Sequence, residues 1–305
     1  IATVGILLAI VALLKVYRVS GRGLFNAAIR AAPAVIAVIG LGLVAYSPFY
    51  FGTFSSQVPL GAPIGAALYS SRPVHFLTVW GLPLLLVAPF LIAQLAGPLR
   101  ARWNWLGAWM FPDLKESGRL RPPFAVPDSP LVLAAVLVGV PFVVWAAIHL
   151  AANDGARAVD VITRFASVLP LAALSFASML ALAHRARRSA ADGGLFALVL
   201  VTLSLYLLYG AELLYVRDVF NSRMNTVFKN YYQVWIFLAA AGGYALHYWG
   251  SRHARWSARV RTFSRTAALL AAVLVVGALY YPFAATFSKA DGFSRDATLD
   301  GLAFI

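Results

Sequence analysis

A short stretch between two apolar runs carries the residue types that could do chemistry. Residues 212–235 read ELLYVRDVFNSRMNTVFKNYYQVW and mix both signs of charge with amide and tyrosine side chains. Arg223 and Lys229 are suited to phosphate or carboxylate, because a guanidinium donates to two oxygens at once and an ammonium acts as a point charge. Glu212 and Asp218 could pair with these cations or serve as general acid or base.

Helical spacing gathers several of these polar groups on one stripe. A helix beginning at Asn221 or Ser222 would continue into the next apolar run. Its stripe would then hold Asn225, Lys229, Tyr232 and Gln233. Ionisable groups that enter a membrane are costly, so we expect this stripe to face protein or a water-filled cavity. The alternative is structural, with Arg and Glu pairing at a helix corner to hold two spans together.

The composition is too apolar for a soluble protein. Of the 305 residues 61% are hydrophobic and 12% charged, whereas a soluble domain carries about 25% charged residues. Apolar runs long enough to cross a bilayer recur along the whole chain. We therefore predict an all-α polytopic transmembrane bundle. About eight spans are expected, near 1–17, 28–48, 74–97, 130–150, 160–183, 194–211, 232–250 and 266–284.

Two connections and the two chain ends carry further expectations. The proline- and glycine-containing loop 49–73 is expected to lie at the membrane interface, with one wall of a lipid-substrate groove as the alternative. The Trp- and Arg-containing loop 98–129 is typical of an amphipathic segment on anionic lipid. We expect a transmembrane helical domain at 1–285, truncated at its N-terminus. Residues 286–305 are expected to start an outer soluble segment or domain, with a solvated linker as the alternative.

Positive charge alternates between successive connections. The net charge is +14, and the connections after the odd-numbered spans carry most of the 25 Lys and Arg residues. Cytoplasmic loops are enriched in Lys and Arg, so we expect the cytoplasmic membrane as the location, with the basic loops cytoplasmic. Both chain ends and residues 212–231 would then lie outside. Nucleic acid is not an expected partner, because its binding needs a basic face on a soluble fold.

The side chains that bind metals most tightly are missing or scattered. The chain has no cysteine, which excludes disulfides, zinc–thiolate sites and cysteine nucleophiles from these residues. The five histidines include no pair at ligand spacing. The sequence therefore predicts no metal site in this chain.

Two motifs carry a family resemblance. RMNTVFKNYYQVW at 223–235, preceded by ELLYVRDVF at 212–220, resembles the signature of a family of bacterial and archaeal membrane proteins named for a YYY motif, a domain of unknown function. PFYFG at 48–52 and TLDGLAFI at 298–305 also resemble that family. The tyrosine triplet itself is not present, since Tyr231 and Tyr232 form only a pair. In architecture this YYY-domain family is similar to the GT-C glycosyltransferases.

The resemblance implies a glycosyltransferase that takes a sugar from a polyprenyl-phosphate carrier on the outer face of the membrane. Arg223 and Lys229 would hold the carrier phosphate, and Glu212 or Asp218 would orient or deprotonate the acceptor hydroxyl. The remaining substrate-binding residues would be Asn225, Tyr232 and Gln233. The implied partners are membrane lipid and the lipid-linked sugar. Ligands for any divalent metal, and a further catalytic carboxylate, would lie upstream of this chain.

Two other functions remain open at this point. A transporter or flippase for a polyprenyl-linked or other amphipathic substrate would use the charged corner as a gate or ion-coupling site. A non-catalytic membrane scaffold would use it only for packing. Every acid of the chain lies near an expected membrane boundary, which argues modestly against proton coupling.

Overall fold

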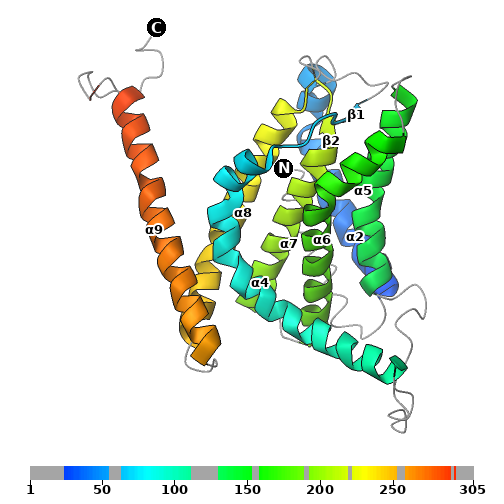
Figure 1. Cartoon of the computed structure of the whole chain (residues 1–305). Helices are drawn as coiled ribbons and strands as arrows, with labels where there is room; N and C mark the ends of the chain where they lie inside the picture. Colours follow the sequence, from blue (N-terminus) through cyan, green and yellow to red (C-terminus); the bar gives the residue numbers. More distant parts are fainter. Residues whose placement is uncertain are drawn as a thin grey trace.

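The computed structural model describes residues 24–54, 63–110, 130–152, 158–188, 192–218, 222–252, 258–289 and 292. Within them the chain is almost entirely helical (Figure 1). The elements are α2 (Leu24–Ala45), the π-helix η1 (Phe49–Phe54), β1 (Ile64–Ala66), α4 (Pro73–Met110), α5 (Pro130–Ala152), α6 (Ala158–Arg188), α7 (Gly193–Leu213), β2 (Leu214–Val216), α8 (Met224–Arg252) and α9 (Ala258–Lys289).

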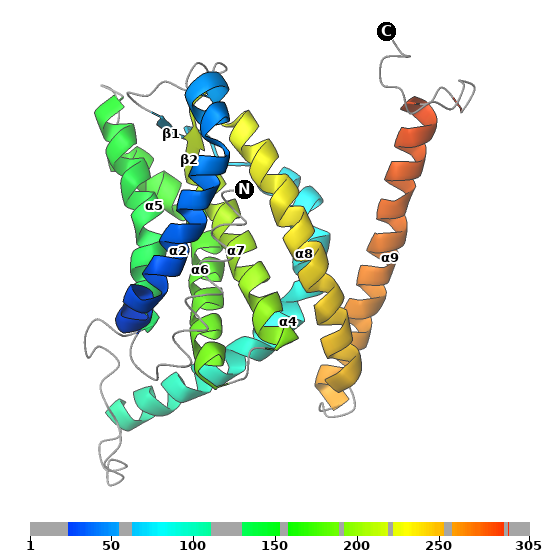
Figure 2. The same cartoon turned by 180° about the vertical axis from the view of Figure 1, so that it is seen from behind.

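The long helices run alternately up and down, so that successive connections fall at opposite ends of the bundle (Figures 1 and 2). β1 and β2 lie at one end, which we call the ribbon end. The helix ends that flank the basic connections lie at the other. α9 stands at the periphery, joined to α8 at the end opposite the ribbon, and most of its side chains are exposed.

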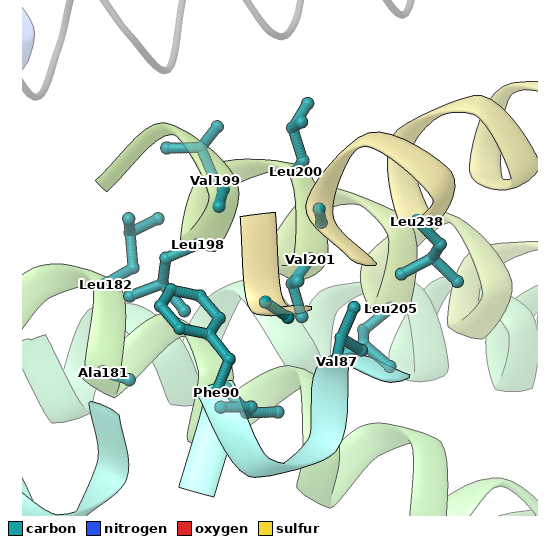
Figure 3. Packing of buried hydrophobic residues seen from close by; sticks show 14 of the residues in the cluster. Val87, Phe90, Ala181, Leu182, Leu198, Val199, Leu200, Val201, Leu205 and Leu238 are labelled. Carbon is teal, nitrogen blue, oxygen red and sulfur yellow. The ribbon is translucent and has the colours of Figure 1, made fainter. Parts of the chain in front are cut away.

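The core surrounds α7, which is apolar on all sides and packs between α6 and α8. Its membrane-spanning window is 78% buried, against 6% for α9. Leu198 and Leu205 of α7 meet Leu238 of α8 and Phe90 of α4 in the main hydrophobic cluster (Figure 3). A helix so enclosed fixes where its last residues lie, and those residues lead into the stretch singled out in the sequence.

Five of the eight expected spans coincide with helices that are long and apolar enough to cross a membrane. They are Pro73–Leu95, Leu131–Ala152, Ala158–Ala186, Gly193–Leu213 and Ala268–Lys289. The second expected span lies in α2, whose apolar part is shorter, Ile29–Ala45. The seventh lies in α8, which has 29 residues and is therefore long enough, but its mean hydropathy is too low for it to count among the five. The first, residues 1–17, lies outside the described residues.

Two described parts of the region 49–73 form regular structure, the π-helix η1 and the strand β1. Ile64–Ala66 pairs antiparallel with Leu214–Val216, with Ile64 opposite Val216. Gly65 permits this pairing because Tyr215 lies directly over it, where a Cβ would clash with the ring. The all-α prediction therefore needs one correction, this two-stranded ribbon. Strands of three residues are too short for an alternating pattern to reveal them.

The structure describes only part of the inner loop 98–129 and of the C-terminal segment 286–305. α4 continues past its apolar span to Met110 and turns across the end opposite the ribbon (Figure 1). Residues 111–129 of the inner loop lie outside the described residues. α9 extends to Lys289, slightly beyond the expected domain boundary at residue 285. The rest of the expected outer segment, apart from residue 292, also lies outside the described residues.

An arginine clamp joins three helices at the end opposite the ribbon. Arg185 of α6 donates from Nη1 to Gln94 Oε1 of α4 (2.6 Å) and from Nη2 to Asp192 Oδ2 (2.7 Å). Asp192 is the N-cap of α7, and its Oδ1 accepts the Leu195 N–H at 2.8 Å. Burial alone raises the pKa of Asp192, but the hydrogen bonds from Leu195 and Arg185 outweigh it and hold this pKa below its ordinary value.

This clamp should contribute stability that depends on acid. Because the folded-state pKa of Asp192 is lowered, its contribution is fully present above the unfolded-state pKa and is lost as pH falls through the folded-state pKa, that is, below about pH 4. The Asp192 side chain is 45% exposed, so solvent screening limits the contribution to about 1 kcal/mol or less. Asp192→Asn keeps the cap acceptor and removes the charge. Unfolding titrations of the two proteins should differ above pH 4 and converge below it, and a gap that persists at about pH 2 would contradict the assignment.

Candidate functional site

A buried acid stands at the centre of the ribbon end. Glu212, in the last turn of α7, is 4% exposed. Its Oε2 accepts the Ser71 backbone N–H (2.7 Å) and Arg223 Nη1 (3.2 Å), and its Oε1 accepts the Ser71 hydroxyl (2.6 Å). Arg223 Nη2 donates to the Ser71 hydroxyl oxygen at 3.1 Å. The residues preceding α4 and α8 thus meet at the end of α7.

A second arginine supports this centre from α6. Arg164 is 5% exposed, and its Nη2 donates to the backbone carbonyls of Ala67 (2.7 Å) and Glu212. Its Nη1 donates to the Ser70 hydroxyl. The last carbonyls of a helix have no partner within the helix, so Arg164 satisfies one at the end of α7 while holding the segment after β1.

We call the side chains of Ser71, Arg164, Glu212 and Arg223 the ribbon-end cluster. The cluster holds two guanidinium groups and one carboxylate, and of the two arginines only Arg223 contacts that carboxylate. Its four side chains therefore carry one positive charge in excess. Burying a charge is costly unless it is compensated. The cluster therefore attracts an anion, and the side chain of Arg223, which is 22% exposed, is its accessible donor.

The cluster's own hydrogen bonds limit what its members can do chemically. Both oxygens of Glu212 are already engaged, with three donors between them, and this binds the carboxylate to Ser71 and Arg223. Arg223 has five N–H donors and uses two of them on Glu212 and Ser71. Among the described residues no three His, Asp or Glu side chains gather closely enough to hold a metal ion. Anion binding is the chemistry that this arrangement favours.

The predicted site residues divide into three groups. Glu212 and Arg223 meet in the cluster. Asp218 and Asn225 pair with each other, Nδ2 to Oδ2 at 2.8 Å. The others lie on α8 outside the cluster: Gln233 is half-buried, and Lys229 and Tyr232 are exposed.

The predicted stripe on α8 does not face the protein at Lys229 and Tyr232. The buried face of α8 runs through Val234 and Leu238, which pack in the core. At about 100° per residue Lys229 and Tyr232 fall on the opposite side, whereas Arg223 falls in line with Val234. Among the described residues no protein covers these two side chains, so the part of the expectation that has them face protein is not met. That Arg223 and Lys229 hold one phosphate stays a prediction.

Sequence reasoning missed three residues beside Glu212. Arg164 carried a signal, because an arginine within an apolar span is costly and tends to be functional. Ser71 carried none. Tyr231 interacts with Ser71 and Glu212 and packs edge-on against Trp80, with ring centroids 4.9 Å apart. Of the tyrosine pair it is thus Tyr231, rather than Tyr232, that lies beside the cluster.

Comparison with known proteins gives a family for most of the chain. Residues 1–238 match the family model described as "Uncharacterized membrane protein (DUF2298)". Comparison with curated proteins finds no match, and comparison with solved structures finds none. The matched region includes the ribbon and the whole ribbon-end cluster, and it covers well over half of the chain. The chain is thus an integral membrane protein that belongs to the DUF2298 family of uncharacterized membrane proteins.

Proposed function

We propose that this protein is a GT-C-like membrane glycosyltransferase that transfers a sugar from a polyprenyl-phosphate carrier at the ribbon end. The observation that carries the proposal is the buried excess of positive charge, Arg164 and Arg223 against Glu212. A lipid-anchored carrier presents a phosphate at the membrane boundary, where α7 ends and α8 begins. The phosphate would supply the missing negative charge. The resemblance of residues 212–235 to the YYY-domain signature supports the same function.

The proposal assigns different roles to the two acids. The engaged carboxylate of Glu212 positions Arg223. The remaining N–H donors of Arg223 hold the carrier phosphate and stabilise its charge as it leaves the sugar with the bonding electron pair. The acceptor hydroxyl oxygen forms the new bond to the sugar, and its proton passes to Asp218, which Asn225 orients.

The residues on the exposed face of α8 have an outer role in this proposal. Lys229 is exposed and Tyr232 packs edge-on against Phe228 at 4.7 Å. A lysine among aromatic side chains at a membrane boundary is suited to a lipid phosphate, with its apolar stem beside the acyl chains. We assign Lys229 and Tyr232 to contacts with surrounding lipid rather than with the reacting carrier. Gln233, which is half-buried, lies between the exposed and the buried face of α8.

The positive-inside rule places the proposed reaction on the outer face of the cytoplasmic membrane. The helix ends that flank the basic connections lie opposite the ribbon (Figures 1 and 2). If those connections are cytoplasmic, the ribbon-end cluster faces outward.

Phosphate-selective lipid binding by the full-length protein tests the proposal. In lipid nanodiscs the protein should bind polyprenyl phosphate at least about tenfold more tightly than the neutral polyprenol, a difference of about 1.4 kcal/mol. Arg223→Lys keeps the charge but loses the two-pronged donor, so it should remove most of that preference. Lys289→Gln, which removes an exposed cation at the ribbon end of α9, is the matched control and should leave the preference intact.

Equal affinity for the phosphate and the alcohol would contradict the proposal. Phosphate-selective binding followed by release of the carrier phosphate from a polyprenyl-phosphate sugar would support glycosyl transfer. Movement of the intact lipid-linked sugar across a proteoliposome membrane, without release of the sugar, would instead support the transporter alternative.

A further inference from the structure

We propose that Arg164 is the positioning residue of the ribbon-end cluster. By fixing residues 67–71 against the end of α7, it sets Ser71 and Glu212, which in turn hold Arg223. The inference deepens the proposed function and rests on it only for the identity of the bound anion.

Both terminal nitrogens of Arg164 donate to the protein, and its Nε is buried without a partner among the described residues. Nη2 donates to the carbonyls of Ala67 (2.7 Å), Tyr69 (3.4 Å) and Glu212, and Nη1 donates to the Ser70 hydroxyl. All these acceptors are uncharged. A rigid, planar guanidinium can hold several carbonyls in one fixed arrangement, which a single ammonium cannot do. Arg164 is therefore placed to organise backbone rather than to contact a ligand.

Neighbouring aromatic and hydroxyl groups restrain the same segment. The Arg164 guanidinium lies over the Trp145 ring, 5.4 Å from its centroid. Trp145 Nε1 donates to the Ala67 carbonyl at 2.9 Å, so that carbonyl accepts hydrogen bonds from both α5 and α6. The Ser70 hydroxyl also lies 2.9 Å from the Ser167 hydroxyl of α6. Residues 67–70 are thus held from two helices at once.

Because residues 67–70 are fixed, Ser71 is held in position within the ribbon-end cluster. Ser71 follows directly after Ser70, and both its backbone N–H and its hydroxyl donate to the Glu212 carboxylate. The same hydroxyl oxygen accepts from Arg223. Without Arg164, the carbonyls of Ala67 and Tyr69 and the Ser70 hydroxyl would lose a donor, and Ser71 would no longer be fixed relative to Glu212. Arg223 would then lose one of its two partners.

Arg164→Lys tests this role in the full-length protein, because it keeps the positive charge and removes the planar guanidinium with its several donors. The reporter is Ala67→Cys, a small change at a side chain that is 2% exposed, in a background without other reactive cysteines. Residues 1–305 contribute none. Arg164→Lys should speed labelling of the introduced thiol by an impermeant maleimide about tenfold, as local opening becomes easier. It should also weaken binding of polyprenyl phosphate about tenfold.

Arg185→Lys is the matched control. It makes the same substitution in the same helix, at the end opposite the ribbon, where Arg185 holds Gln94 and Asp192. We expect it to lower the thermal midpoint without changing either readout at the ribbon end. Ser70→Ala, which removes the Nη1 acceptor and the contact with the Ser167 hydroxyl but keeps the carbonyl acceptors of Nη2, should give a smaller change of the same sign in both readouts. It keeps the test decisive if Arg164→Lys fails to fold.

The outcomes separate the inference from the proposed function. Weaker binding with unchanged labelling of the introduced thiol would make Arg164 a direct anion ligand and would overturn the positioning role. No change in either readout, or equal changes in Arg164→Lys and Arg185→Lys, would overturn it as well. Faster labelling in a protein whose wild-type form shows no preference for the phosphate lipid would support the positioning role and refute the proposed function.

Discussion

Replacing Glu212 by alanine is expected to lower the free energy of unfolding by about 3–5 kcal/mol. The change leaves Arg223 without its carboxylate partner and removes the negative charge near the buried Arg164, and an uncompensated buried charge has a cost of this size. The Glu212 side chain is 5% exposed, so water cannot replace the lost partner. Ser71 would also lose the acceptor for its N–H and hydroxyl donors. Unfolding of the purified protein by SDS in mixed micelles, followed by circular dichroism, measures the loss.

The ion pair of Arg185 and Asp192, at the end opposite the ribbon, gives a comparison for the stability lost in Glu212→Ala. Asp192→Asn removes a carboxylate that is 45% exposed, and its cost should stay within about 1 kcal/mol. In a double-mutant cycle, Glu212→Gln and Arg223→Gln should show a coupling of about 0.5–3 kcal/mol, because the two side chains are in direct contact. A Glu212→Ala variant as stable as Asp192→Asn would show that the ribbon-end cluster is solvated.

The pair of Glu212 and Arg223 also fits the structural alternative raised by the sequence, because it joins the end of α7 to the start of α8. Pairing alone, however, would need only one arginine. Arg164 adds a second charge from α6 without adding an acid. It is this imbalance, rather than the presence of an ion pair, that favours an anionic ligand over packing alone.

The fold could be predicted where hydrophobicity alone decides the structure. The apolar runs that form α5, α6 and α7 are long enough to cross a membrane, and length with composition identifies them. The ribbon could not be predicted in the same way. Its pairing depends on Gly65 lying beneath Tyr215, which is far away in the sequence, and three-residue strands carry no periodic signal.

The site could be predicted only where its members are close in sequence. Glu212 and Arg223 are separated by 11 positions and fall in one conspicuous stretch. Ser71 is 141 positions from Glu212, and only the folded bundle brings them together. Spacing on α8 indicates which side chains fall on one stripe of the helix. Which face turns inward depends on the neighbouring helices, and for that reason spacing alone could not predict that Lys229 is exposed.

The packing around α7 predicts the second large effect. Phe90→Ala should lower the free energy of unfolding by about 3–5 kcal/mol. Phe90 is 0% exposed and packs edge-on against Tyr244 and Tyr248, with ring centroids 5.5 and 5.2 Å apart. Helices associate in a membrane mainly through van der Waals packing, so a cavity between α4 and α8 removes contacts that lipid cannot replace. The same SDS titration measures this loss.

Phe283→Ala separates packing from simple loss of apolar surface. Phe283 is on α9 and 67% exposed, and the same substitution there should change stability by about 0.5 kcal/mol or less. Phe90→Leu, which keeps most of the buried volume, should recover a large part of the stability lost in Phe90→Ala. Equal effects at Phe90 and Phe283 would mean that the contacts of α4 with α8 do not stabilise the bundle. Because Trp80 and Tyr231 meet across that same interface, the geometry beside Glu212 would then need another support.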